Sequence, residues 1–131
     1  MKKFSINGRL IGNGQPTFII AEISANHNHD IQEAIDLIRI AKECEADAIK
    51  IQTYTPNTMT IDCDNEYFQI GEGTIWEGKS LYELYGEAYM PWEWIPQLIE
   101  EAHKVGITLF SSPFDSTSVD FLENLDMPAY K

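Results

Sequence analysis

The sequence predicts an α/β fold in which parallel strands alternate with helices. Three short apolar segments, 18–24, 48–53 and 107–112, have the character of buried strands and are separated by segments with helical spacing of apolar residues. A strand, a helix and a second strand within about 35 residues form a βαβ unit, which implies parallel strands with a right-handed crossover. Three such units and the start of a fourth at 127–131 make either half of an eight-stranded barrel or most of a small open sheet.

The composition is that of one globular domain that binds neither nucleic acid nor membrane. The chain has 131 residues, of which 44% are hydrophobic, and a formal net charge of −12, which argues against a basic face for a nucleic-acid backbone. No apolar run reaches the roughly 18 residues of a membrane span, and no signal-peptide core follows the N-terminus. Cys44 and Cys63 lack metal-type spacing. We therefore expect a cytoplasmic protein with two free thiols.

The N-terminal part, residues 1–17, is predicted to form a short β-hairpin, because Asn7-Gly8 is a strong turn signal between short apolar pairs. The parallel domain then spans residues 18–131. Its first strand, Phe18–Ser24, is an almost continuous apolar run, which predicts burial on both faces. Glu22 is costly to bury in such a run, so we expect it to be paired or used chemically.

Start and stop signals place the helices between these strands. Asp30 is expected to cap a helix that runs to residue 44 or 45, with Glu33 completing a capping box. A second capping box, at Ser80, predicts a short helix within the long segment 54–90, which is either a functional lid or a packed surface excursion. The remaining signals are Pro91 and Gly106 around the next helix, Pro113 as the break after the third strand, Asp115 or Ser116 as the cap of the last helix, and Val119, Leu122 and Leu125 as its inward face.

Polar side chains gather at the carboxyl ends of the predicted strands, where parallel α/β proteins hold their active sites. Lys50 is the most informative, because buried positions flank it on both sides. It either forms an ion pair with Glu22 that has no chemical role, or it binds an anion. A second lysine in the fourth strand, Lys131, favours a cationic floor for a phosphate or carboxylate, with a hydroxyl from Ser111 or Ser112. Glu22 is then an acid–base or orienting group.

Further polar candidates follow the first two strands. Period-two alternation places Gln52 on the same face as Lys50. Asn26 and His27 lie in the polar tip after the first strand, where His27 is equally consistent with a structural histidine. His27 and His29 are only two residues apart, with no third ligand near in sequence, so no metal-binding residue is predicted in this chain.

Four segments in the same order together resemble the sialic acid synthase family. They are Ile20–His27 (IAEISANH), Ala46–Pro56 (ADAIKIQTYTP), Phe110–Phe114 (FSSPF) and Pro128–Lys131 (PAYK). Three further segments, 73–78, 81–85 and 91–94, are more similar to the pseudaminic acid synthases of that family than to its N-acetylneuraminate synthases.

The resemblance implies a TIM (β/α)8 barrel, and this chain is expected to be its first half. The rest of the barrel is expected to be absent. So is a C-terminal antifreeze-like domain, which in the family reaches into the partner's site of a homodimer. It implies condensation of phosphoenolpyruvate with an open-chain acylated amino-deoxy hexose, giving a nonulosonic acid and phosphate. It also implies a divalent metal ion, Mn²⁺ or Mg²⁺, whose ligands lie in later strands outside this chain.

The resemblance also implies roles for single residues. Lys50, Ser112 and Lys131 fall where the family binds phosphoenolpyruvate, and Glu22 falls on its catalytic glutamate. Gln52, Asn26 and His27 fall where the sugar is met. Two positions depart from the family pattern, because His29 and Glu45 stand where members usually carry glycine. Glu45 therefore has to adopt a left-handed backbone.

Two other interpretations stay open. One is an N-acetylneuraminate or legionaminate synthase, against which only the segment 54–90 argues. The other is a non-catalytic half-barrel that binds a ligand or a complementary chain through exposed strand edges. The first predicts turnover of a different sugar, and the second predicts self-association without turnover.

Overall fold

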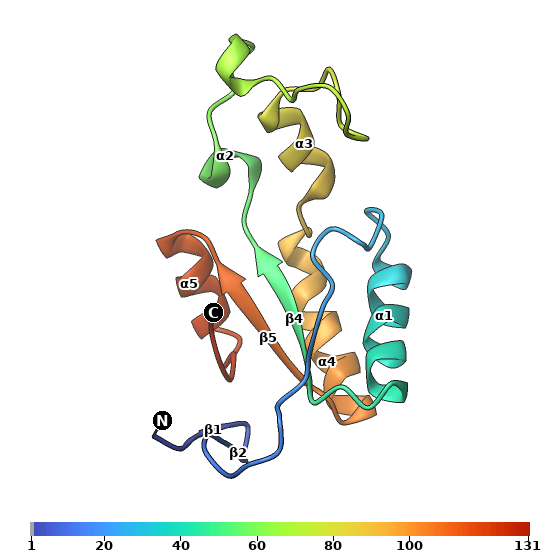
Figure 1. Ribbon diagram of the computed structural model, residues 1–131, viewed down its shortest axis with the longest axis vertical. Coiled ribbons are helices and arrows are strands. Elements are labelled where there is room, and N and C mark those ends of the chain that lie inside the picture. The colour runs from blue at the N-terminus through green and yellow to red at the C-terminus, as the bar shows by residue number, and fades with distance from the viewer. Residues whose placement is uncertain (1) are drawn as a thin grey trace.

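The computed structural model describes residues 2–131 as a small antiparallel hairpin followed by a parallel α/β unit (Figure 1). The hairpin consists of β1 (Phe4–Ile6) and β2 (Arg9–Ile11). The main sheet has three parallel strands in the order β3 (Ile20–Glu22), β4 (Ala48–Thr53) and β5 (Thr108–Pro113). The predicted α/β class and the predicted hairpin are confirmed.

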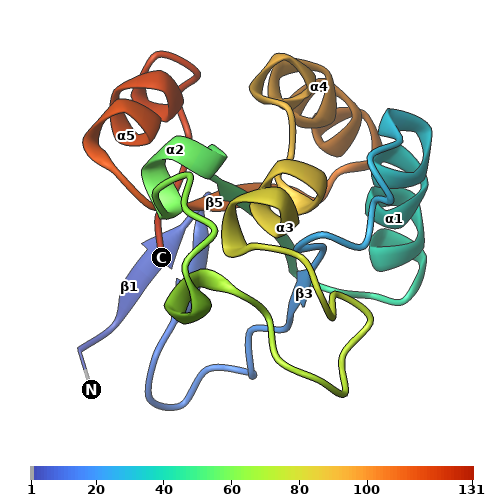
Figure 2. The same cartoon turned by 90° about the horizontal axis from the view of Figure 1, so that it is seen from above.

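One face of this sheet is covered by α1 (Ile31–Glu43), α4 (Ile95–Val105) and α5 (Ser116–Glu123). Seen from above, these three helices lie on the same side of the strands (Figure 2). No helix within residues 2–131 has the length and apolar composition needed to cross a membrane. In chain order the helices are α1 (Ile31–Glu43), α2 (Pro56–Met59), the 3₁₀ helix η1 (Glu66–Phe68), α3 (Leu81–Ala88), the 3₁₀ helix η2 (Trp92–Trp94), α4 (Ile95–Val105) and α5 (Ser116–Glu123).

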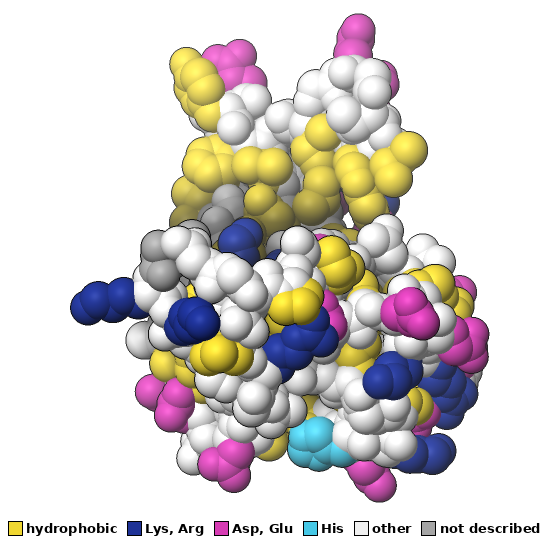
Figure 3. Space-filling model, turned by 60° about the horizontal axis from the view of Figure 1, so that its bottom comes forward, with side chains coloured by type: hydrophobic (Ala, Val, Ile, Leu, Met, Phe, Trp, Pro, Cys, Tyr) yellow, Lys and Arg dark blue, Asp and Glu magenta, His cyan; other side chains and the backbone are white. Residues whose placement is uncertain are grey.

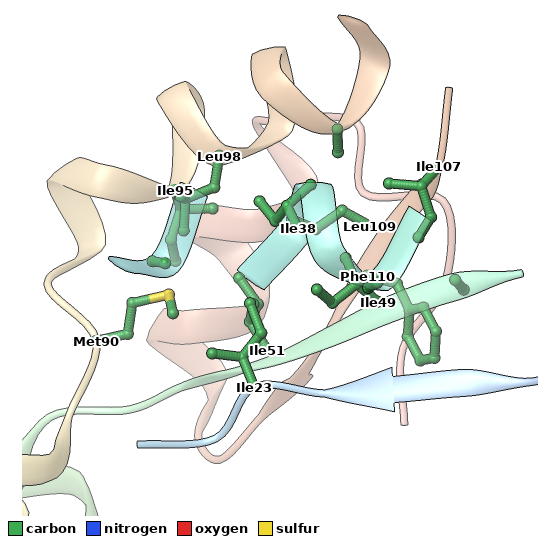
Figure 4. Packing of buried hydrophobic residues seen from close by; sticks show 14 of the residues in the cluster. Ile23, Ile38, Ile49, Ile51, Met90, Ile95, Leu98, Ile107, Leu109 and Phe110 are labelled. Carbon is green, nitrogen blue, oxygen red and sulfur yellow. The ribbon is translucent and has the colours of Figure 1, made fainter. Parts of the chain in front are cut away.

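The hydrophobic core lies between this helix layer and the sheet (Figure 4). Ile49 and Ile51 of β4 meet Ile38 of α1 and Leu98 of α4 in one cluster, and each is at most 1% exposed. Burying an aliphatic side chain of this kind contributes roughly 1.5–3 kcal/mol. Because Ile49 and Ile51 alternate with Lys50, this packing turns Lys50 to the opposite face of the sheet.

Asp30 caps α1 as predicted, but the expected capping box does not form. The Asp30 carboxylate accepts a hydrogen bond from the Gln32 backbone N–H at 2.7 Å. Glu33 instead accepts a hydrogen bond from Asn28 Nδ2 at 2.6 Å. The Glu33 side chain therefore ties the loop after β3 to the first turn of α1.

Most other sequence signals for helix ends are confirmed. The helix expected to begin at Pro91 is instead divided, with Pro91 capping η2 and α4 beginning at Ile95. Ser80 and Glu83 form the capping box of α3, and Gly106 ends α4 in the left-handed region at φ 73°. Asp115, rather than Ser116, caps α5.

The inward face of α5 differs from the prediction. Val119 is exposed, whereas Ser118 and Leu122 are fully buried. The Ser118 hydroxyl donates to the Asp115 carbonyl at 2.7 Å and accepts from the Phe114 backbone N–H at 3.1 Å. This local hydrogen bonding draws a polar residue inward, which an apolar pattern does not reveal.

The segment 54–90 contains two short helices, α2 and η1, that the sequence analysis did not predict. α2 begins after Thr55, which forms a capping box with Thr58, and Pro56 occupies its first position. The Tyr82 hydroxyl of α3 donates to Asn57 Oδ1 of α2 at 3.0 Å. The segment is therefore built from structured pieces that contact one another.

The prediction that residues 18–24 form a strand buried on both faces is wrong. β3 covers only Ile20–Glu22, and Ile19 and Ile20 are 53% and 43% exposed. β3 is an edge strand that pairs with β4 alone, so an apolar sequence here meets too few neighbours within residues 2–131. Figure 3 shows hydrophobic side chains exposed beside lysines and arginines on the side turned to the viewer.

The predicted fourth strand at 127–131 forms only in part. One parallel bridge joins Tyr130 to Ser111 of β5, and the Lys131 backbone N–H donates to the Ser111 carbonyl at 3.0 Å. The segment thus lies beside β5 in the predicted direction. Pro113, predicted to break the third strand, is its last residue, a position where the missing N–H is tolerated.

The hairpin attaches to the amino end of the main sheet. Arg9 forms an ion pair with Asp47, which also accepts a hydrogen bond from the Ile19 backbone N–H at 2.7 Å. Asn7 Nδ2 donates to Thr108 Oγ1 at 3.2 Å. Asp47 precedes β4 and Thr108 begins β5, so the hairpin lies at the end of the sheet opposite the strand ends that carry the candidate site.

Glu45 adopts the left-handed backbone that the sequence predicts, at φ 61°. Glycine carries no Cβ penalty there, so Glu45→Gly should raise the free energy of unfolding by about 1 kcal/mol. Urea denaturation of the 131-residue chain measures the change. Glu43→Gly, at the last residue of α1, is the matched control and should lower the stability, by less than the roughly 1 kcal/mol of a glycine in a helix interior. Losses of similar size in both variants would contradict the prediction.

Candidate active site

Two rows of side chains lie on the sheet face that points away from the helices. In the parallel register, Glu22 of β3 pairs with Lys50 of β4, and Lys50 pairs with Phe110 of β5. Two residues further along, Gln52 pairs with Ser112. Paired residues of neighbouring strands point to the same side, and alternate residues share a side. These five residues therefore share one surface, which we call the polar face.

The Lys50 ammonium forms an ion pair with the Glu22 carboxylate at the centre of the polar face. The Lys50 side chain is 13% exposed and that of Glu22 is 33% exposed. Glu22 Oε1 also accepts a hydrogen bond from the Ser24 backbone N–H at 3.2 Å. Burial, and then the charge of Lys131, lower the pKa of Lys50. Desolvation offsets much of the attraction in such a pair, so an incoming anion can compete for Lys50 without a large loss of fold stability.

Lys131 joins the polar face from the C-terminal segment. Its neighbour Tyr130 is bridged to Ser111, and the Tyr130 hydroxyl donates to Glu123 of α5 at 2.5 Å, on the helix side. By alternation, Lys131 belongs to the side that carries Ser112. The charge of Lys131 adds to burial in lowering the pKa of Lys50, as expected of two ammonium groups on the same side of the sheet.

Ser112 carries a buried hydroxyl without a partner. The residue is 6% exposed, and its Oγ makes no hydrogen bond within residues 2–131. The neighbouring Ser111 is different, because its Oγ lies 2.7 Å from Thr53 Oγ1 and 3.3 Å from the Ile51 carbonyl. A buried unpartnered hydroxyl costs roughly 1–3 kcal/mol. Ser112, rather than Ser111, is therefore the hydroxyl that is available to a ligand.

His27 is buried in a different environment from the polar face. Its ring is 0% exposed and packs edge-on against Trp94, with 5.6 Å between ring centroids. Nδ1 accepts a hydrogen bond from the His29 backbone N–H at 3.1 Å, and Nε2 has no partner among the residues described. The buried ring leaves no surface for the predicted sugar contact. In this structure His27 instead supports the loop between β3 and α1.

The burial of His27 makes the stability of the chain depend on pH. Burial, and then the neighbouring His29, lower the pKa of His27 below 6.5, against a smaller opposing effect of Glu33. As the pH falls below about 6.5, His27 is protonated in the unfolded chain before it is protonated in the folded chain. The free energy of unfolding should therefore decrease by at most about 1.4 kcal/mol per pH unit. Urea denaturation between pH 7.5 and 5 measures this slope.

A histidine control separates this effect from general acid destabilisation. His27→Gln should flatten the slope between pH 6.5 and 5, whereas His103→Gln, at an exposed position of α4, should leave it as in the parent chain. An unchanged slope in His27→Gln would show that His27 stays uncharged or titrates alike in both states.

A cleft of about 660 Å³ lies beside the loop that follows β3. It shares no lining residue with the polar face, although Asn26, one of the predicted sugar contacts, lines it. One wall consists of Ala25, Asn26, Asn28 and His29, and the other consists of Ile75, Trp76, Gly86, Glu87 and Ala88.

The structure brings most of the predicted site residues together. Glu22, Lys50, Gln52, Ser112 and Lys131 share one side of the sheet, while Asn26 lines the cleft and His27 is buried. The sequence analysis missed Phe110, although its alternation with Ser112 was a usable signal. It also missed the cleft, because the second wall comes from a segment that only tertiary contacts bring near the first.

The chain matches known proteins over most of its length. Residues 37–131 match the family model described as NeuB family. A pseudaminic acid synthase of Campylobacter jejuni is 50% identical over 114 residues, which cover 87% of this chain and 33% of that protein. An N,N′-diacetyllegionaminic acid synthase of Legionella pneumophila is 35% identical over 127 residues, covering 96% and 35%. The chain thus spans about a third of the length of these curated relatives.

The fold also matches a solved structure. An N-acetylneuraminic acid (sialic acid) synthetase of Leptospira borgpetersenii aligns with a TM-score of 0.79 at 25% identity, over 98% of this chain and 40% of that one. Sequence and structure agree on the relationship over nearly the whole chain. The chain therefore belongs to the NeuB family.

Proposed function

We propose that this chain is part of an enzyme that condenses phosphoenolpyruvate with an acylated amino-deoxy hexose, forming a nonulosonic acid of the pseudaminic acid type and releasing phosphate. The observation that carries the proposal is the polar face, where the Glu22–Lys50 pair lies with Lys131 and the unpartnered hydroxyl of Ser112. Two ammonium groups and a hydroxyl suit a small ligand that bears a phosphate and a carboxylate. The similarity to synthases of the family supplies the reaction class.

In this proposal each residue of the polar face has a separate task. Lys50, Lys131 and Ser112 hold the phosphate and carboxylate of phosphoenolpyruvate through charge-assisted hydrogen bonds. The enol carbon bonds to the sugar aldehyde carbon, water adds to the resulting oxocarbenium carbon, and the tetrahedral intermediate loses phosphate. Glu22, held beside Lys50, orients the reactants or moves a proton in these steps. Gln52 contacts the sugar.

The described residues do not fit the divalent metal ion, Mn²⁺ or Mg²⁺, that the family resemblance implies. Within residues 2–131, no three His, Cys, Asp or Glu side chains gather as a metal site. Glu22, the carboxylate of the polar face, is already paired with Lys50. We therefore derive no step of this chain through a metal, and propose that residues outside this chain hold it.

We further propose that the main sheet and its helices form the first half of a TIM barrel, with residues 18–131 as that half and residues 1–17 as a hairpin ahead of it. The parallel strands, the helices on one side and the polar residues at the strand ends support this. The exposed Ile19 and Ile20 would be covered by other strands of the barrel. A homodimer and a cytoplasmic location belong to the same proposal and rest on the family resemblance.

The sugar is proposed to be a diacylated deoxy hexose of the pseudaminic acid pathway. The chain is 50% identical to the Campylobacter jejuni pseudaminic acid synthase and 35% identical to the Legionella pneumophila legionaminic acid synthase. An N-acetylneuraminate or legionaminate synthase uses the same chemistry with another sugar. A panel of acylated amino sugars separates these alternatives.

Phosphate release tests the proposal directly. The test uses the whole protein, which is this chain within a protein of its relatives' length. It should release phosphate only when phosphoenolpyruvate and an acylated amino sugar are both present. Mass spectrometry should show the condensed acid. The 131-residue chain alone should be inactive. Self-association without phosphate release from any sugar of the panel would favour the non-catalytic half-barrel instead.

A further inference from the structure

The loop between η1 and α3 is held in a defined shape that presents Trp76 to the cleft. The Ile70 backbone N–H donates to the Lys79 carbonyl at 2.9 Å and so closes the loop. Inside the loop, the Trp76 backbone N–H donates to Thr74 Oγ1 at 3.2 Å, and the Lys79 backbone N–H donates to the Trp76 backbone carbonyl at 3.1 Å. Trp76 is half-buried and lines the cleft. A ligand would therefore meet an indole ring that the loop has already placed.

Lys79 links this loop to α3. Its Nζ lies 2.6 and 2.5 Å from the two carboxylate oxygens of Glu87 and 5.4 Å from the centroid of the Trp76 ring. A partly exposed ion pair and a cation–π contact are each weak. Together they hold Trp76 against α3 and neutralise the Glu87 carboxylate that lines the same wall.

The two walls of the cleft differ in chemistry. The loop after β3 contributes the carboxamides of Asn26 and Asn28, whereas Ile75 and Trp76 make the opposite wall largely apolar. Among residues 2–131, no lysine or arginine lines this cleft. Its volume of about 660 Å³ is that of a small-molecule site. Such a cleft suits a neutral ligand with amide groups on one side and methyl groups on the other. The nearby Lys79 ammonium is already paired with Glu87, so it is not available to a phosphorylated sugar.

We propose that Trp76 is a specificity-determining residue for the acylated sugar, with its indole receiving the methyl groups of the acylamino or deoxy substituents. Asn26 faces the substituent's amide group, and Lys79 is a positioning residue that acts through Trp76. This inference rests on the proposed function, because it takes the sugar as the ligand. The structural link is the loop after β3, in which Asn26 lies four residues beyond Glu22 of the polar face.

The test compares the kinetic constants for the two substrates in the whole protein. Trp76→Ala should raise the KM for a neutral diacylated amino sugar on the order of tenfold or more, because the lost apolar contact discriminates by that much. The KM for phosphoenolpyruvate should not change. Trp76→Phe should restore most of the loss. Tyr67→Ala is the matched control, since Tyr67 is an aromatic residue of the same segment, is 81% exposed and does not line the cleft.

Two further variants probe the positioning role and the polarity of the cleft. Lys79→Ala should raise the sugar KM less than Trp76→Ala does, and Lys79→Arg should behave like the parent protein. Trp76→Lys should improve the relative use of a sugar phosphate over the neutral sugar. Thermal melting of each variant separates lost binding from lost folding, and Trp76→Leu replaces Trp76→Ala if the latter does not fold.

The outcomes distinguish this inference from the proposed function. Normal turnover by the parent protein together with an unchanged sugar KM in folded Trp76→Ala would overturn the role of Trp76 and leave the proposed function in place. Equal changes in both KM values would also overturn it. A parent protein that releases no phosphate with any acylated amino sugar would overturn the proposed function, and this inference with it.

Discussion

Lys50→Ala in the whole protein should raise the KM for phosphoenolpyruvate about 10- to 100-fold, while the KM for the sugar changes little. The Lys50 side chain is only 13% exposed on the polar face, so in the variant water can substitute only poorly for its interaction with the ligand. A charge-assisted hydrogen bond to a phosphate or carboxylate is worth roughly 1.5–3 kcal/mol. Initial rates at varied phosphoenolpyruvate and saturating sugar measure the change.

A second lysine shows whether the effect is specific. Lys104 of α4 is 71% exposed, so Lys104→Ala should leave both KM values unchanged. Because Lys50→Ala leaves Glu22 without its partner, a melting curve must accompany the kinetics. Unchanged kinetics in a folded Lys50→Ala variant would remove Lys50 from the site, and the anion-binding role of the polar face with it.

Glu22→Gln should lower kcat about 10²- to 10⁴-fold and leave both KM values within a few fold. The amide keeps the size of the side chain but can neither carry the charge nor move a proton, and a positioned acid or base contributes about that factor. The Ser24 backbone N–H and the Lys50 ammonium fix the carboxylate in place. Single-turnover measurements with saturating substrates separate this loss from slow product release.

Two further variants serve as controls for Glu22→Gln. Glu22→Asp retains the charge at a shorter reach and should recover part of the rate. Glu93→Gln, at an exposed position of η2, should keep the parent kcat. A kcat in Glu22→Gln equal to that of the parent would leave Glu22 as a structural partner of Lys50 only.

Local signals predicted the elements that local physics controls. The Asn7-Gly8 turn, the Asp30 and Ser80 caps and the left-handed Glu45 all depend on backbone and side-chain contacts a few residues apart. One local signal was ambiguous. Glu33 turned from the helix cap to Asn28, because two acceptable partners compete and only the folded loop decides between them.

The number of strands that lie beside each strand was the main property that the sequence could not supply. The apolar run around Ile20 indicates that the segment can be buried, but its burial depends on how many strands lie beside it. In this structure β3 has one neighbour, so Ile20 stays exposed. His27 shows the opposite difference. Its sequence context predicts a residue in an exposed polar tip, but in the structure His27 is completely buried, beside Trp94 and within the loop around it.

The sequence by itself determined the parallel α/β class and placed Glu22, Lys50, Gln52 and Ser112 at strand ends, because strand alternation and helix periodicity are properties of the chain. Only the tertiary structure decided which of these side chains meet. The register between strands set Glu22 against Lys50 and Gln52 against Ser112. The packing of the segment 54–90 created the cleft beside Asn26, because contacts between residues far apart in the chain leave no local pattern.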